Sequence, residues 1–268
     1  MSNIKLNETP LRTSRNYNIN NIKLENINIP EQIGKFKNVS ITGANYTNNI
    51  TTLKLTYGLS QELETQVANK SNQKIKIELK DSENVQIDFK FDKQNLNLIE
   101  NIEIIAKECT KEATVIIKYE SKEEIESYHN GILNVIAKAN SKLNIILVNL
   151  VSTSSNNFIA IENTLEENAN ITYWIIDFGG KNSITNYYSN LIGNSSSNNI
   201  NAIYLGKEEQ LFDLNYIAHL KGEKTNVNIV VEGALTDKAK KNFKGTIDFK
   251  KGARKAIRKW NRSMYTTI

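Results

Sequence analysis

The fold is decided by a short apolar stretch, Leu143-Asn-Ile-Ile-Leu-Val148, which has counterparts before and after it along the chain. The counterparts are Thr114-Val-Ile-Ile-Lys-Tyr119, Ile171-Thr-Tyr-Trp-Ile-Ile176, Ile200-Asn-Ala-Ile-Tyr-Leu205 and Val227-Asn-Ile-Val-Val231. Short continuous runs rich in β-branched and aromatic residues are typical of strands that are buried on both faces. Because no sustained apolar stripe occurs at the helical period, the sequence predicts a mainly β protein.

These runs recur at a nearly constant interval. From Val115 to Val227 they begin every 27 to 29 residues, and Ile247 follows after another 20. A fixed period of this length is typical of stacked repeats, in which each unit buries its apolar face against its neighbours. A Greek-key sandwich is the structural rival, but it needs a turn about every 8–12 residues. The period therefore favours a parallel β-helix (β-solenoid) whose coils contain two or three strands.

Three parts are expected along the chain. Residues 1–107 form a small N-terminal region, with an irregular start broken at Pro10 and Pro30 and with cap strands towards its end. Residues 108–252 form the β-helix core, and residues 253–268 form a basic tail of unassigned structure.

Local patterns give three further expectations. Small residues and Asn precede several strands, as in Ala139-Asn140 and Ala169-Asn170, and Asn tolerates the left-handed backbone of tight corners. One helical turn is expected over 236–243, with Thr236 or Asp237 as its N-cap. Tyr173-Trp174 lies within an apolar run, so both rings are expected in the core.

The composition excludes several classes of protein. The 268 residues include 39% hydrophobic residues, which is enough for a core, and one cysteine, Cys109, which excludes an intrachain disulfide framework. The N-terminus has no apolar segment typical of a signal peptide, and no run approaches the length of a transmembrane helix. A cytoplasmic protein is expected.

The net charge of +5 is unevenly distributed. Between Asp237 and Arg262 there are eleven Lys or Arg and two Asp, whereas the rest of the chain has 23 basic and 27 acidic residues. A basic segment can bind nucleic acid or an acidic partner, although a solvated lysine-rich surface is the more common case.

Few residues are candidates for chemistry. The two histidines, His129 and His219, lack partners at the spacing of a catalytic triad or a zinc site. Cys109 cannot hold a metal cluster within one chain, and a quiet thiol is the more common case for such a residue. The acidic clusters Glu123-Glu124-Ile-Glu126 and Glu162 to Glu167 are typical of solvated turns. We assign no catalytic, cofactor-binding or metal-ligating residue.

Four segments resemble the SufB/SufD family of iron–sulfur cluster assembly proteins. The most specific is Gly233-Ala-Leu-Thr-Asp-Lys-Ala-Lys-Lys-Asn-Phe243-Lys-Gly-Thr-Ile-Asp-Phe249, which is similar to the family's Leu-x-Asp-x-Ala-x-x-x-Phe-x-Gly-x-Ile-x-Val segment. The others are Phe212-Asp-Leu-Asn-Tyr-Ile-Ala-His219, His129-Asn-Gly-Ile-Leu-Asn-Val-Ile-Ala137 and Asn7-Glu-Thr-Pro-Leu-Arg-Thr13, the last of which looks like a motif of SufD-type members. The resemblance spans nearly the whole chain.

The resemblance implies a right-handed parallel β-helix that acts as a non-catalytic, SufD-like scaffold subunit in iron–sulfur cluster assembly. It implies a SufB-like partner bound through the β-helix core, and a SufC-like ATPase bound through a C-terminal helical domain. No cofactor is expected on this chain alone, since a nascent iron–sulfur cluster would form only in the assembled complex. Neither nucleic acid nor a membrane is an expected partner.

The C-terminal residues depart from the family pattern. Family members continue with further strands, a segment around a His-Gly/Ala-Ala-x-Val-Gly motif and the ATPase-docking domain. The final residues, Arg258-Lys-Trp-Asn-Arg-Ser-Met-Tyr-Thr-Thr-Ile268, fit none of these. The chain is therefore expected to be an incomplete copy with an uncapped sheet end. No cluster-binding residue is transferred, and His219 is not assigned to the family's interfacial histidine.

Two other function classes stay open at this point. A β-helix carbohydrate-active enzyme would need carboxylates that converge from adjacent coils. A basic-tailed binding protein would need aromatic rings beside its lysines, where Phe243, Phe249, Trp260 and Tyr265 are the candidates.

Overall fold

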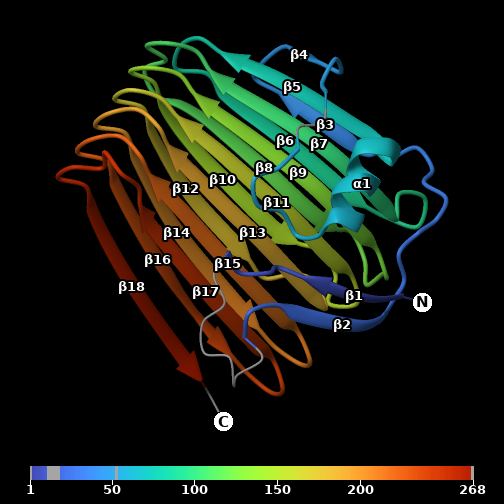
Figure 1. The fold of residues 1–268 in the computed structure, drawn as a ribbon. Coiled ribbons are helices and arrows are strands. Elements are labelled where there is room, and N and C mark those ends of the chain that lie inside the picture. Colours follow the sequence, from blue (N-terminus) through green and yellow to red (C-terminus); the bar gives the residue numbers. More distant parts are fainter. Residues whose placement is uncertain (1, 11–18, 52–53, 267–268) are drawn as a thin grey trace.

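The apolar runs of the sequence are parallel strands that stack coil upon coil (Figure 1). The structure, a computed structural model, describes residues 2–10, 19–51 and 54–266. From residue 73 onward the strands alternate between two eight-stranded sheets, which together form a parallel β-solenoid of about six turns. Each coil contributes one strand to each sheet, and Leu143 pairs with Ile171, 28 residues later. The predicted fold class is confirmed, with coils of two strands.

We call the two layers the open sheet and the covered sheet. The open sheet consists of β3 (Val39–Thr42), β6 (Asn84–Phe91), β8 (Ala113–Ser121), β10 (Lys142–Leu150), β12 (Asn170–Asp177), β14 (Ser197–Gly206), β16 (Asn226–Leu235) and β18 (Ile257–Thr266). The covered sheet consists of β4 (Tyr46–Thr47), β5 (Gln73–Leu79), β7 (Asn97–Ala106), β9 (Tyr128–Ala137), β11 (Asn156–Leu165), β13 (Asn182–Leu191), β15 (Leu211–Leu220) and β17 (Lys240–Phe249). The short strands β3 and β4 run antiparallel to their neighbours at one end.

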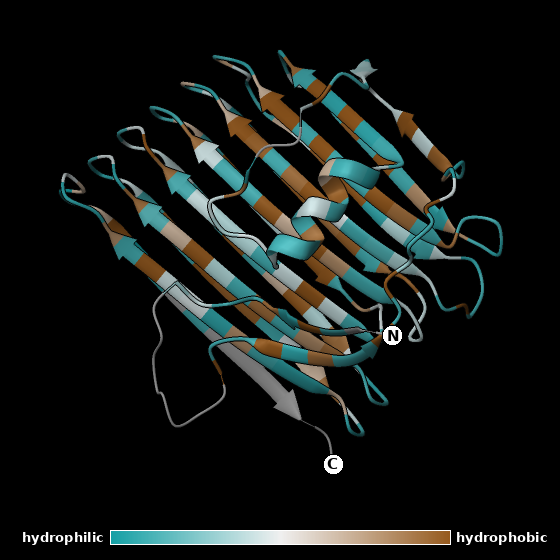
Figure 2. Ribbon diagram, turned by 45° about the vertical axis from the view of Figure 1, so that its right-hand side comes forward, coloured by the Kyte–Doolittle hydropathy of each residue, from teal (hydrophilic) through white to brown (hydrophobic). Residues whose placement is uncertain are grey.

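The core lies between the two sheets and follows from the alternation of side chains along each strand. In β8, Val115, Ile117 and Tyr119 point inward and are buried, and the same pattern repeats in the other coils. Figure 2 shows the alternating hydropathy along the strands. Neighbouring coils bury each other's apolar rows, so no single coil would be stable by itself.

Tight corners join the covered sheet to the open sheet, and from the corner between β7 and β8 onward each contains a non-glycine residue with positive φ. These residues are Cys109, Asn140, Asn168, Ser195, Lys224 and Lys255, with φ between 54° and 62°. Their backbone N–H groups bond the next corner, as from Asn140 to the Glu167 carbonyl at 2.8 Å. The expected left-handed corner at Asn140 is confirmed.

The N-terminal region folds over the outer face of the covered sheet (Figures 1 and 2). It contains the antiparallel pair β1 (Ser2–Leu6) and β2 (Ile22–Ile27), and the helix α1 (Gln61–Lys70). The Ser60 side chain caps α1 by accepting the backbone N–H of Leu63 at 3.3 Å. Leu63 and Val67 are buried against outward-facing apolar residues of the covered sheet.

Three local expectations differ from the structure. The helical turn predicted over 236–243 is wrong, because these residues form a corner and the start of β17. Ile247 does not begin a shortened repeat, since it lies in the covered sheet and pairs with Ala218. The solenoid extends on both sides of residues 108–252, from β5 to β18. At 236–243 the helical propensity of the charged segment was outweighed by strand pairing with the preceding coil.

Candidate functional site

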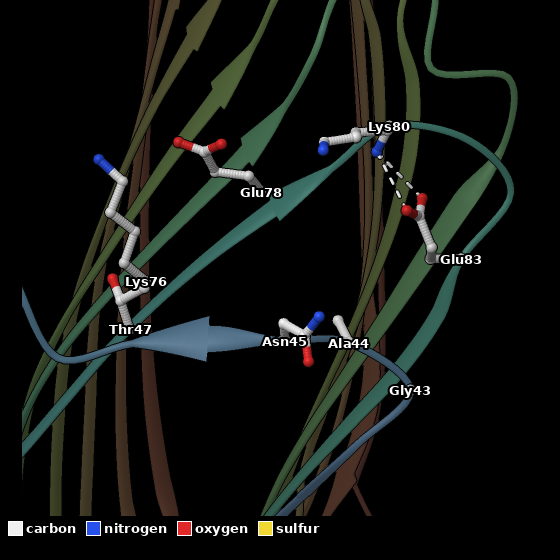
Figure 3. A pocket seen from close by; sticks show the side chains of 8 residues that line it. All are labelled: Gly43, Ala44, Asn45, Thr47, Lys76, Glu78, Lys80 and Glu83. Carbon is white, nitrogen blue, oxygen red and sulfur yellow. Dashed lines mark hydrogen bonds between the residues drawn. The ribbon is translucent and has the colours of Figure 1, made fainter.

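A shallow pocket lies between the antiparallel strands at the N-terminal end and β5 (Figure 3). Two of its charged side chains, Lys76 and Glu78, form ion pairs that bridge neighbouring coils. Lys76 Nζ lies 2.7 Å from Glu103, and Glu78 lies 2.6 Å from Lys107 Nζ. The carboxylate of Glu83 accepts the backbone N–H of Lys80, as the dashed lines show. These pairs support the coils and leave little charge directed at a ligand.

The interior of the solenoid contains a cluster of three buried polar side chains, one on each of the successive strands β7, β8 and β9. The hydroxyl of Tyr119 donates to the carboxylate of Glu100, whose Oε1 atom lies 3.2 Å from His129 Nε2. Burial, followed by the nearby negative charge of Glu100, raises the pKa of Tyr119 well above its usual range, so the phenol keeps its proton. His129 is therefore a buried residue of the core.

This polar group continues into the next two coils. His129 Nδ1 lies 2.6 Å from Asn157 Oδ1, and Asn157 donates to the hydroxyl of Ser183 at 3.3 Å. Ser183 in turn donates to Asp177 Oδ2 at 2.7 Å, and Asn149 donates to Asp177 Oδ1 at 2.7 Å. Burial raises the pKa of Asp177 to about 6 although these hydrogen bonds oppose the shift. The network can hold protons and set the register of the coils, but its groups are shielded from solvent.

His219 lies on the outer face of the covered sheet, in a second polar cluster. Its Nδ1 atom is 3.2 Å from the hydroxyl of Tyr188, and its Nε2 atom is 3.5 Å from the hydroxyl of Tyr57. Asp248 Oδ2 lies 4.0 Å from the same Nε2 atom. The structure thus brings together β13, β15, β17 and a segment near residue 57, which the sequence pattern did not connect.

Asn7 attaches the N-terminal segment to the same face. Its side-chain N–H group donates to Asp213 Oδ1 at 2.7 Å, and Lys244 Nζ lies 2.6 Å from the same oxygen. All three side chains are buried. Asn7 belongs to the segment that resembles the SufD-type motif, so this motif serves to fasten the N-terminal cover. Residues 11–13 of that motif lie outside the described residues.

The solenoid ends on an open edge at β17 and β18. Within the described chain each of these strands pairs on one side, with β15 and with β16 respectively. The two strands and the turn between them contain most of the basic stretch from Asp237 to Arg262. An unpaired strand edge presents backbone donors and acceptors to a partner chain. The positive charge of the protein is therefore concentrated at this edge.

The remaining candidates are dispersed. Cys109 is exposed at a corner. Glu124 accepts bonds from the Ser152 and Ser154 hydroxyls, each at 2.8 Å, while Glu162 accepts the backbone N–H of Thr56 at 2.6 Å. These acidic groups therefore serve loops and do not converge from adjacent coils.

The side chains of Tyr173 and Trp174 lie on opposite faces of the open sheet. Tyr173 is buried as expected, whereas the expectation for Trp174 is wrong, because its side chain points outward from the open sheet and is 46% exposed. Successive residues of a strand face opposite sides of the sheet, so both rings could not enter the core.

The described residues contain neither a cluster of typical metal-binding side chains nor a membrane-spanning helix. No three His, Cys, Asp or Glu side chains lie together in the arrangement of a metal site. In the same part of the chain, no helix has the length and apolar character needed to cross a membrane.

Comparison with known proteins identifies the family. No curated protein matches the chain. The family described as SUF system FeS cluster assembly, SufBD core domain, matches residues 89–263, which is more than half of the chain and runs from β6 into β18. The matched stretch coincides with the regular coils and includes both the interior polar network and the open edge. By this match and by its parallel solenoid, the chain belongs to the SufB/SufD family of iron–sulfur cluster assembly proteins.

Proposed function

We propose that the chain is a non-catalytic, SufD-like scaffold subunit that pairs with a SufB-like subunit through its terminal coil, β17 and β18. The open basic edge of this coil is the observation that carries the proposal. Backbone pairing would supply affinity, while the lysines would select a partner with an acidic terminal coil. In this proposal the iron–sulfur cluster is cargo that forms in the assembled complex.

The backbone geometry of β17 shows which groups a partner strand could reach. Lys240 donates its backbone N–H to the Gln210 carbonyl at 2.8 Å, and Lys250 donates to Leu220 at 2.9 Å. Backbone N–H groups alternate between the two sides of a parallel strand. Phe249, one residue before Lys250, therefore directs its backbone N–H group away from β15 and towards the open edge.

Co-purification with candidate SufB-like and SufC-like proteins tests the assignment. We expect the SufB-like subunit to be retained, and retained less as salt is raised, because exposed charges are screened within about 8–10 Å at moderate ionic strength. Failure to retain a SufB-like subunit at low salt would contradict the proposal.

A Phe249→Pro substitution tests the edge itself. Proline removes the N–H group that faces the partner but leaves the ladder between β17 and β15 intact. We expect pairing with the SufB-like subunit to weaken at least about tenfold, which corresponds to about 1.4 kcal/mol. Phe249→Ala is the control, since it removes the same side chain and keeps the N–H group. Equal effects of the two substitutions would show that the side chain alone acts at this position.

A further inference from the structure

Three polar residues form a row across neighbouring strands of the covered sheet. Asn190 on β13 pairs in register with His219 on β15, which pairs in register with Asp248 on β17. Side chains at the same register of parallel strands point to the same face and start about 4.8 Å apart. The row therefore places an amide, an imidazole and a carboxylate side by side on the outer face.

The segment before α1 adds a fourth group to this row. The hydroxyl of Tyr57 lies 3.5 Å from His219 Nε2, and Asp248 Oδ2 lies 4.0 Å from the same atom. Asn190 Oδ1 is shielded from solvent and has no hydrogen-bond partner among the described residues. Two oxygen atoms thus approach one imidazole nitrogen, and a third, Asn190 Oδ1, lies on the neighbouring strand without a proton donor among the described residues.

The distances suit a single bound cation. A tetrahedral site with bonds of about 2.1 Å separates its ligand atoms by about 3.4 Å. The hydroxyl of Tyr57 is already at such a distance from His219 Nε2, and a rotation of the exposed Asp248 side chain would bring its oxygen as close. Imidazole and carboxylate ligands together suit zinc, iron, cobalt and similar divalent ions better than magnesium or calcium.

The surroundings of His219 prepare its Nε2 atom for this role. Tyr188 contacts the opposite ring nitrogen at 3.2 Å, as groups that orient metal-binding histidines do. Because Tyr188 contacts Nδ1, the Nε2 atom is the ring nitrogen that faces Tyr57 and Asp248.

We propose that Tyr57, Asn190, His219 and Asp248 form a binding site for one divalent first-row transition metal ion on the outer face of the covered sheet. Lys250 competes with this ion for Asp248, because its ammonium group donates a hydrogen bond to the Asp248 carboxylate. Binding would transfer Asp248 from Lys250 to the metal. The site lies on the sheet face and does not depend on the scaffold role proposed for the terminal edge.

Titration of the full chain with Co²⁺ tests the proposal, because its visible absorption reports the ligands. A Cys109→Ser background removes the exposed thiol, which could bind the ion independently. We expect one equivalent of Co²⁺ to bind, with bands that Zn²⁺ abolishes by competition. His219→Ala should remove the bands, and Asp248→Asn should weaken binding at least about tenfold.

Lys250→Met distinguishes a metal site from a merely structural cluster. We expect this substitution to tighten Co²⁺ binding several-fold, since it frees Asp248 and removes a nearby positive charge. Glu232→Gln on the exposed face of β16 is the control and should leave binding unchanged. Identical titrations for the background protein and the His219→Ala variant would overturn the proposal, as would unchanged or weaker binding by the Lys250→Met variant.

Discussion

At the scale of single residues, the polar groups inside the solenoid are expected to affect the free energy of unfolding more than those on its surface. Asp177 is fully enclosed between the sheets and is held by Asn149 and Ser183. Burial raises the pKa of this carboxyl from 3.8 to about 6, so the folded protein resists its ionisation. Such a group sets register and specificity at a cost in stability at neutral pH.

Asp177→Asn is expected to stabilise the protein at neutral pH. Because the pKa is raised in the folded state, the carboxyl contributes its full stability below about pH 3.8 and loses it as the pH rises through about 6. The shift corresponds to about 3 kcal/mol as an upper estimate. Chemical denaturation should therefore show little difference between variant and wild type near pH 4, and a higher free energy of unfolding for the variant at pH 7.

The exposed Asp81 offers a matched control for this substitution. Asp81→Asn makes the same chemical change at a residue whose ion pair with Lys111 is long and solvated, at 3.7 Å. It should change the free energy of unfolding little at either pH. A pH dependence of the Asp177→Asn variant parallel to that of the wild type would contradict the assignment.

At the scale of elements, the corners determine how closely the coils stack. Each corner that leads from the covered to the open sheet between Cys109 and Lys255 has a non-glycine residue with positive φ, but the residue types differ. Asn at 140 and 168 adopts this conformation with little strain, and the two side chains bond each other at 3.1 Å. Lysine at 224 gains neither advantage, so its corner stores strain.

Lys224→Gly is expected to raise the free energy of unfolding by about 0.5–1 kcal/mol. Glycine relieves a φ of 54°, and this gain exceeds the added entropy of the unfolded chain. The neighbouring Lys221→Gly is the control, since Lys221 has no positive φ, and it should destabilise. Urea denaturation measures both, and a loss of stability in Lys224→Gly would show that the corner is not strained.

At the scale of the whole molecule, the two sheets have different surroundings. The N-terminal region covers the outer face of one sheet by apolar packing of β1, β2 and α1, while Trp174 and Ile203 stay exposed on the other. The solenoid is held by backbone ladders between coils, and the cover is held by side-chain contacts. The cover can therefore detach without unpairing the coils.

Val67→Asp is expected to release α1 while the solenoid persists. Val67 is fully buried, and an unpaired carboxylate there would cost several kcal/mol. Limited proteolysis should cleave the variant within 61–70, and its β-sheet circular dichroism should be kept. Ala68→Asp, one residue further on the exposed side of the helix, should behave as wild type. Loss of the sheet signal in Val67→Asp would show that cover and solenoid unfold together.

The sequence by itself determined the repeating architecture. Apolar runs at 143–148 and 171–176, and a period near 28 residues, predict stacked coils. They do so because the burial of each strand is visible in the apolar pattern of its own consecutive residues. The segment from Gly233 to Phe249 also carried the family resemblance that the comparison confirms. Local periodicity could not reveal α1, whose charged residues mask the buried Leu63 and Val67, nor a second strand in the last coil.

Only the tertiary structure decided which polar groups meet. Tyr57, Asn190, His219 and Asp248 are far apart in the chain, and they converge because the strands pair in register and the N-terminal segment crosses them. The same holds for Asn7, which reaches Asp213 and Lys244 through that crossing. A sequence pattern reports the face on which a residue lies, whereas register and the path of a distant segment decide its neighbours.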